Sequence, residues 1–284
     1  MGIVFALLAS LTLAMSQVVI KKSFDRFSPS ITFFFNTLFG LLIWIPIAFL
    51  IGVNFKESFK IIIFSFISAV LSEAFFFYVL SKGRLCVTGT ILATYPIYTI
   101  LFSVFINKEV LSNNQYIFIA VTIIGTMLIS LPEKLNSKDL LEFSKIGWAL
   151  CGAIATGLAD SMAKNAIDDS SAGTFLLFLA LTQIPVGFVF IKLENGNFSI
   201  VKDMLRNFKT YKVSIIGSLL NVVGVIFLSL ALQSTLASIA SPITATNPAI
   251  MVLLSLFVLK ESVTGIGLLG IVSVITGIVG VSMY

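Results

Sequence analysis

This 284-residue chain is dominated by apolar side chains: 58% of its residues are hydrophobic, 11% are charged, and its mean hydropathy is +1.07. A soluble domain carries roughly 25% charged residues, which it needs to cover a water-facing surface. The 31 charged residues here form short clusters between long apolar runs, so the pattern excludes a soluble globular protein and is typical of a polytopic membrane protein. The net charge of +5 does not favour a nucleic-acid partner, because Lys and Arg flank the apolar runs as membrane topology requires.

The sequence contains no histidine. Ser-His-Asp and Cys-His catalysis, HExxH zinc sites and His-ligated haem are therefore excluded, and we expect no catalytic residue, cofactor or metal site. Cys86 and Cys151 form no CxxC pair, so they predict neither a disulfide framework nor a redox motif.

Ten apolar runs, bounded by charged residues, Gly or Pro, have about the length of 20 residues that a helix needs to cross a bilayer. We therefore predict an all-α integral membrane protein with ten transmembrane helices. The first run lacks a basic leader and a small-residue cleavage site, so it is predicted to be a helix and not a signal peptide. The predicted helices are residues 2–20, 31–52, 59–80, 87–107, 115–131, 146–165, 173–192, 213–232, 237–258 and 264–283.

The second half of the chain repeats the first. At an offset of 152 residues, Ile91–Glu109 and Ile243–Glu261 align without a gap and are identical at nine of 19 positions. The register continues to Gly125 and Gly277, in the fifth and tenth predicted helices. The chain is thus predicted to contain two five-helix repeats.

The predicted repeats are residues 1–131 and 146–284, joined by a loop at 132–145. Because five is an odd number, the second repeat must enter the membrane in the opposite orientation to the first. Inverted repeats recur in secondary transporters, where two similar halves can open a central site alternately to each side.

Each repeat carries a Pro-x12-Glu motif at the end of its fourth helix, Pro96–Glu109 and Pro248–Glu261, with a glycine in the helix that follows. In these features, and over essentially its whole length, the chain resembles the EamA-type permeases of the drug/metabolite transporter superfamily. The resemblance implies a ten-helix basket whose central cavity is lined mainly by helices 1, 3, 4, 6, 8 and 9. It does not name the solute, since such permeases carry amino acids, nucleotide-linked compounds, vitamins and drugs. The small-multidrug-resistance relatives have an essential glutamate in their first helix, and this chain has none there.

A proline lies near the middle of the fourth and ninth predicted helices. Pro96 and Pro248 each remove one backbone hydrogen bond and displace a carbonyl, that of Leu92 or Thr244. A freed carbonyl in a membrane is tolerated where protein or water satisfies it, so these helices are predicted to wall a cavity. A simple kink, rescued by a hydroxyl group or water, is the alternative. The residues assigned to the kinks and the cavity wall are Pro96, Pro248, Thr94 and Thr246.

Glu73 is the most informative polar residue, because a charge near the bilayer centre costs about 3 kcal/mol or more. No basic residue lies within two helical turns of it. We expect Glu73 to line a cavity and to couple proton movement to solute movement; hydrogen-bonded packing between helices is the alternative. Tyr95, Asn221 and Asn247 lie at similar depth and could orient a solute. The predicted substrate-binding residues are therefore Glu73, Tyr95, Asn221 and Asn247.

Asp160 is a second acid within a predicted helix, further from its centre. Lys164 follows one turn later and is predicted to neutralise it as an i,i+4 pair, with a coupling role for Asp160 as the alternative. Asn36 and Gln17 lie nearer helix ends and are predicted to be interfacial. The Lys-Glu pairs that end both motifs are predicted to tie helix ends together, with gating as the alternative.

The charge distribution conflicts with the topology that the resemblance implies. If the first helix starts in the cytoplasm, fourteen Lys and Arg lie on the outer side and four on the inner side. The positive-inside rule then predicts external termini. The resemblance implies cytoplasmic termini, and both orientations stay open.

Together these features predict a secondary active transporter that moves a small organic metabolite or drug-like solute by alternating access. The expected setting is the cell (inner or plasma) membrane, the expected contacts are solute and lipid, and the expected state is a monomer or weak homodimer. Two alternatives stay open. One is a lipid-carrier flippase, which a lateral opening lined by Asn36 and Gln183 would favour; the other is a non-transporting receptor or assembly subunit.

Overall fold

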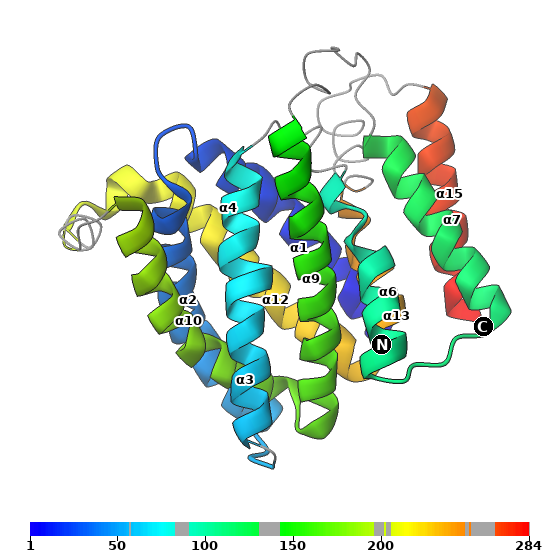
Figure 1. Cartoon of the computed structure of the whole chain (residues 1–284), viewed down its shortest axis with the longest axis horizontal. Coiled ribbons are helices and arrows are strands. Elements are labelled where there is room, and N and C mark those ends of the chain that lie inside the picture. The colour runs from blue at the N-terminus through cyan, green and yellow to red at the C-terminus, as the bar shows by residue number, and fades with distance from the viewer. Residues whose placement is uncertain are drawn as a thin grey trace.

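The computed structural model describes residues 1–56, 58–82, 91–130, 143–195, 202, 206–247, 250 and 265–283. Within these ranges every regular element is a helix, and the helices pack side by side in one bundle (Figure 1). The elements are α1 (Gly2–Ser23), α2 (Pro29–Ile51), α3 (Ser58–Ser68), the π-helix η1 (Ala69–Ala74), α4 (Phe75–Lys82), α6 (Tyr95–Ile106), α7 (Asn113–Ser130), α9 (Phe143–Asp169), α10 (Ala172–Asn195), the 3₁₀-helix η2 (Phe208–Tyr211), α12 (Lys212–Ser234), α13 (Ala237–Thr244) and α15 (Gly265–Met283).

Several of these helices are long and apolar enough to cross a bilayer. Five segments in the described chain qualify, and α6 and the C-terminal part of α15 are shorter apolar helices. The all-helical, multi-pass class is therefore confirmed, and each of the ten predicted runs contains described helical residues. The inverted relation of the two repeats stays a prediction. The five long segments are Gly2–Ser23, Pro29–Ile51, Ser58–Lys82, Ala172–Glu194 and Phe208–Ser234.

The bundle is held together by helix pairs that join the two halves of the chain. α1 packs along α12, α2 along α10, α6 against α9 and α7 along α15. Polar bonds link the halves: the Ser16 hydroxyl donates to the Gly217 carbonyl at 2.8 Å, and the Trp44 indole N–H donates to the Val222 carbonyl at 2.9 Å. The interior between the halves is consequently where a shared site can form.

The helices α7 and α15 lie beside each other at one edge of the bundle (Figure 1). Their glycines permit a very close approach, because a Cβ atom on Gly125 would lie 2.8 Å from the Gly270 carbonyl oxygen. A Cβ on Gly277 would lie 2.1 Å from Thr122 Oγ1 and 2.8 Å from the Phe118 carbonyl oxygen. These are the two glycines that the repeat alignment pairs, and both serve the same helix contact.

We expect Gly277→Ala to destabilise the protein, because the added methyl group would overlap the α7 backbone and overpacking costs about 1–3 kcal/mol. Gly265→Ala in the same helix is the matched control, since a Cβ there meets nothing within 4 Å. Thermal unfolding of the purified protein in detergent checks this prediction. Equal unfolding temperatures for the two variants would contradict it.

The fourth predicted helix is interrupted, not kinked. A turn at Ala93–Thr94 separates the helical residues Ile91 and Leu92 from α6, which begins at Tyr95. Pro96 therefore lies in the first turn of α6, where its missing N–H leaves no intrahelical bond unmade. The prediction of a mid-helix kink at this proline is wrong.

A second interruption follows α13, at Ala245–Thr246. Thr246 Oγ1 donates to the Ile243 carbonyl at 2.7 Å, and Thr94 Oγ1 donates to the Ile91 carbonyl at the same distance. The two threonines are equivalent in the repeat alignment, so the same local bond recurs in both halves. Pro248, Lys260 and Glu261 lie outside the described residues, as do Cys86 and most of the predicted connecting loop.

Candidate functional site

A cavity of about 60 Å³, lined by both polar and apolar side chains, lies inside the bundle, and a second cavity of about 30 Å³ shares part of its lining. The larger cavity is enclosed by α1, η1–α4, α6, α9, α12 and the α13 region. These correspond to the first, third, fourth, sixth, eighth and ninth predicted helices, the set that the family resemblance implied. Its lining residues are Leu13, Gln17, Ser72, Glu73, Phe76, Phe77, Tyr95, Thr156, Asp160, Asn221, Val225, Leu228, Thr244 and Asn247.

The four residues predicted to bind a solute all line this one cavity. Glu73 comes from η1, Tyr95 from the start of α6, Asn221 from α12 and Asn247 from the turn after α13. Residues 148 positions apart in the sequence are thus brought to one site, and Asn221 donates to Glu73 there. Their role as solute ligands stays a prediction.

Glu73 is held in a network of side-chain amides. It is 7% exposed, and its Oε2 accepts hydrogen bonds from Asn36 Nδ2 at 3.0 Å and Asn221 Nδ2 at 3.1 Å. Asn221 Nδ2 also lies 3.1 Å from Asn36 Oδ1. Three helical segments therefore meet at one carboxyl group.

The backbone at Glu73 is a π-helix, Ala69–Ala74, inside the apolar span Ser58–Lys82. The Phe75 N–H bonds to the Val70 carbonyl, five residues back, instead of four. Such single-turn π-helices are rare and occur frequently at functional sites. The sequence carried no signal for it, because the apolar run shows no break there.

Asn36 and Gln17 were predicted to be interfacial, and the prediction is wrong for Asn36. Asn36 is fully buried and donates to Glu73, while Gln17 lines the central cavity. A buried acid needs hydrogen-bond donors, and an amide from α2 supplies one. Position along a predicted helix indicates the depth of a residue in the membrane. It does not indicate whether the side chain points into the bundle or toward lipid.

Asp160 does not pair with Lys164, contrary to the prediction. Its Oδ2 accepts a hydrogen bond from the Ser241 hydroxyl at 2.7 Å, and the side chain is 4% exposed at the cavity. Lys164 instead forms an ion pair with Asp168, again one turn along α9. The buried lysine is thus neutralised by an acid whose own side chain is half exposed, and Asp160 is left facing the interior.

Tyr95 is positioned beside this acid by a close contact between α6 and α9. A Cβ on Gly157 would lie 2.7 Å from the Thr99 nitrogen and 2.9 Å from the Tyr95 carbonyl oxygen, so only glycine permits this approach. The Tyr95 hydroxyl donates to the Ser241 carbonyl at 3.1 Å. Ser241 thus links Tyr95 and Asp160.

Two threonines whose hydroxyl groups were not predicted to face the cavity line it without a partner among the described residues. Thr156 is 8% exposed and Thr244 is 2% exposed, and neither hydroxyl has a hydrogen-bond partner among the described residues. Thr94, Pro96 and Thr246 are not among the residues that line this cavity. The hydroxyls of Thr94 and Thr246 turn back to their own backbone, so the predicted wall is formed by different side chains.

One end of the bundle is tied by Glu109. Its two carboxyl oxygens accept the backbone N–H groups of Ala237 at 2.8 Å and Ser238 at 3.0 Å, at the start of α13. Unpaired N–H groups and the positive end of the helix dipole favour a carboxylate at this position. The prediction that the first Lys-Glu pair ties helix ends is confirmed for Glu109.

Other bonds tie the opposite end. Lys21 Nζ donates to the Leu80 carbonyl at 2.8 Å, and the Ser30 N–H donates to Glu194 Oε2 at 2.9 Å. Between these ends the cavity of about 60 Å³ has room for a few water molecules, whereas small-molecule pockets measure about 300–1,000 Å³. In this conformation the cavity is therefore smaller than a typical small-molecule site.

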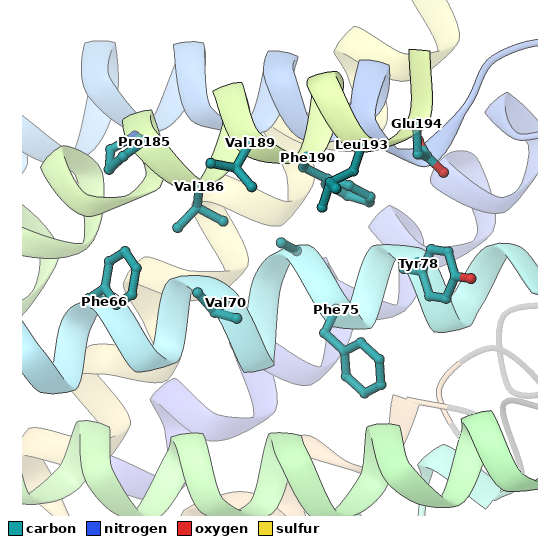
Figure 2. Close-up of a pocket in the computed structure, with 11 residues that line it drawn as sticks. Phe66, Val70, Phe75, Tyr78, Pro185, Val186, Val189, Phe190, Leu193 and Glu194 are labelled. Atoms are coloured by element: carbon teal, nitrogen blue, oxygen red, sulfur yellow. The ribbon is translucent and has the colours of Figure 1, made fainter. Parts of the chain in front are cut away.

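A separate groove of about 530 Å³ runs between the span Ser58–Lys82 and α10 (Figure 2). Its walls are apolar, with Tyr78 and Glu194 toward one end. Neither Asn36 nor Gln183 lines it, and Gln183 is fully buried. This groove is therefore not the lateral opening that was expected to favour a flippase.

An all-helical chain with several apolar spans that enclose a polar cavity has the architecture of a polytopic membrane transport protein. The model of the EamA-like transporter family matches residues 1–131 and 143–283. The chain belongs to this family.

Two relatives support the assignment, and one solved structure shares the fold. The chain is 26% identical over 250 residues to an uncharacterized transporter of Helicobacter pylori strain 26695, over 87% of this chain and 82% of that protein. An uncharacterized transporter of Clostridium kluyveri is 26% identical over 206 residues, or 66% of this chain and 60% of that protein. A crystal structure with 12% identity has a TM-score of 0.75 and covers 99% of this chain and 96% of its own, which shows a shared fold. The family and these relatives indicate a transporter, not an enzyme.

Proposed function

We propose that the protein is a secondary active transporter that moves a small organic metabolite or drug-like solute across the cell membrane by alternating access. The observation that carries this proposal is the central cavity, where polar groups from both halves converge in the interior of apolar helices. Polar residues are expensive within a membrane and mark solute or ion pathways. A buried polar cavity shared by two halves is a physical reason to expect transport.

The interrupted helices supply a candidate moving part. Each half contains a turn at the same point of the repeat, with the same threonine-to-carbonyl bond of 2.7 Å. Discontinuous helices at the bilayer midplane are characteristic of transporters with inverted repeats. In our proposal the two halves are inverted repeats that exchange conformations, so that the cavity opens first to one side and then to the other.

Proton coupling through Glu73 is the second part of the proposal. One oxygen of its carboxyl group accepts from the two amide donors, and Glu73 lines both cavities. A carboxyl group can be neutral or charged, and a change in its protonation alters how strongly it attracts a solute and its amide partners. We propose that the protein works as a monomer or weak homodimer, in contact with membrane lipid.

Purified protein can test the proposal while the identity of the solute is still open. A panel of metabolites and drugs is first screened for thermal stabilisation, because a ligand raises stability with the logarithm of its concentration over its Kd. Each binder is then loaded into proteoliposomes, and exchange of the labelled compound is followed with and without a pH gradient. We expect saturable exchange of at least one binder.

The competing functions give different results in the same vesicles. A compound that binds but never crosses would favour a receptor or assembly subunit. Movement of a labelled lipid carrier between leaflets, without solute exchange, would favour a flippase. Either result would overturn the transporter proposal.

A further inference from the structure

We infer that the central cavity binds an organic amine in its cationic form, which exchanges for a proton. This inference rests on the proposed transport function and adds a substrate class to it. It starts from the charges at the cavity: Glu73 and Asp160 both line the two adjoining cavities, and each comes from a different half of the chain. Among the described residues, no lysine or arginine lines either cavity.

The neighbouring bases are already engaged elsewhere. Lys164, one turn from Asp160, is paired with Asp168, and Lys21 on α1 donates to the Leu80 carbonyl. The remaining groups that face Glu73 from α1, α2 and α12 are the neutral amides of Gln17, Asn36 and Asn221. In the described part of the chain, the one other titratable side chain on the cavity lining is Tyr95. A positive charge that compensates the acids must therefore arrive with a ligand or as a proton.

The hydrogen-bonding capacity left open at the cavity suits an ammonium group. Each acid uses one oxygen within the protein: Glu73 Oε2 accepts from two amides and Asp160 Oδ2 accepts from Ser241. The other oxygens, Oε1 and Oδ1, make no hydrogen bond within the described chain. The Thr156 and Thr244 hydroxyls are likewise without partners there. An ammonium group carries three N–H donors and no acceptor, so it complements these oxygen atoms.

The remaining lining favours an apolar body on the amine. Phe76 and Phe77 supply aromatic rings, and Leu13, Val225 and Leu228 supply aliphatic surface. Aromatic rings attract cations and exclude water from them. An anion would bind unfavourably, because it would meet two acids and no described base. A zwitterion would bind less well than an amine, because its carboxylate would enter the same surroundings. The cavity therefore discriminates by charge, with shape as a secondary factor.

Charge balance links amine binding to protons. Two ionised acids in a membrane interior are costly without compensation, so the empty cavity favours the state in which both acids hold a proton. In that state the cavity has no net charge. Entry of one monocation then displaces one proton from one acid, and the net charge of the cavity is unchanged. Release of the amine on the other side requires a proton to return, which makes the cycle an exchange of amine for proton.

The test compares three amines with their alcohols: methylamine with methanol, butylamine with butanol, and 2-phenylethylamine with 2-phenylethanol. Binding to the purified full-length protein is measured by calorimetry in buffers of different ionisation enthalpy, which also counts the protons released. We expect at least one amine to bind about tenfold or more tighter than its alcohol, because hydrogen bonds to a charged group are the stronger ones. We expect one proton released per amine bound.

Glu73→Gln and Asp160→Asn each keep an acceptor oxygen and remove one ionisable group. Each is expected to weaken amine binding by about tenfold or more and to abolish or reduce proton release. Asp169→Asn is the matched control, because Asp169 pairs with Lys60 at the surface, outside the cavity. Alcohol binding and thermal unfolding of the same samples report whether each variant is folded.

If no amine binds more tightly than its alcohol, the inference is overturned. The same holds if phenylalanine binds more tightly than 2-phenylethylamine, or if both cavity variants bind amines as the unmodified protein does. Proteoliposome exchange separates this inference from the proposed function. If only neutral or zwitterionic solutes are exchanged, the proposed transport function stands and the inference of an amine substrate is overturned. If an amine binds but does not cross the membrane, the proposed transport function is overturned.

Discussion

Glu73→Gln is expected to abolish proton-driven accumulation of solute and to reduce the pH dependence of solute exchange. The amide retains an oxygen that can accept from Asn36 and Asn221, which now bond to Glu73 Oε2 at 3.0 and 3.1 Å, but it can neither bind nor release a proton. The measurement is uptake into proteoliposomes at several pH values, with and without an imposed gradient. Because the acceptor is kept, we expect the free energy of unfolding to change by about 1 kcal/mol or less.

Glu194→Gln is the control for this prediction. Like Glu73, Glu194 accepts an N–H group, in its case the backbone N–H of Ser30, but it lies at the end of its apolar span and does not line either central cavity. The control is expected to keep the pH dependence of the unmodified protein. Proton-driven accumulation that persists in Glu73→Gln would rule out this residue as the coupling group.

Glu109→Ala is expected to loosen one end of the bundle and to lower stability by about 2 kcal/mol or more. Two buried N–H groups, on Ala237 and Ser238, lose their acceptor, and each unsatisfied donor costs about 1–3 kcal/mol. Glu109→Gln keeps one acceptor oxygen, so its stability should lie between that of the unmodified protein and that of Glu109→Ala. Thermal unfolding in detergent gives the order of the three proteins.

Opening of this end can be measured separately with a cysteine at Ser238, which is fully buried beneath the Glu109 contact. The reporter is placed in a background in which Cys86 and Cys151 are replaced by serine. We expect a membrane-impermeant thiol reagent to label Ser238→Cys several-fold faster when Glu109 is also replaced by alanine. Glu194→Ala, at the other end of the bundle, is the control. Equal labelling rates would show that Glu109 stabilises α13 without restraining access.

The cavity residues were predictable where one physical cost decided their position. Glu73 within an apolar run is expensive unless a polar cavity surrounds it, and depth along the helix placed Tyr95, Asn221 and Asn247 at the same level. The structure brings all four to one cavity. Depth and cost can be read from a linear sequence, so these residues could be found.

Orientation around a helix axis was the part that could not be predicted. Asn36 has the depth of an interfacial residue but turns toward Glu73, and Lys164 turns away from Asp160 toward Asp168. A uniformly apolar membrane helix has little amphipathic asymmetry to indicate its inward face, because lipid and protein interior are both apolar. Thr156 and Thr244 were missed for the same reason.

By itself, the sequence determined that the protein is all-helical and membrane-spanning. Its hydrophobic residues, 58% of the chain, form long runs that satisfy their backbone groups within a bilayer by helix formation. The sequence also determined the internal repeat and the acids that need a polar environment. The tertiary structure alone decided which side chains complete that environment, the π-helix at Glu73, and the bond of Glu109 to α13. Those features accompany contacts between helices that are far apart in the sequence. Such contacts depend on how the helices pack in three dimensions, and the apolar pattern of the sequence does not specify that packing.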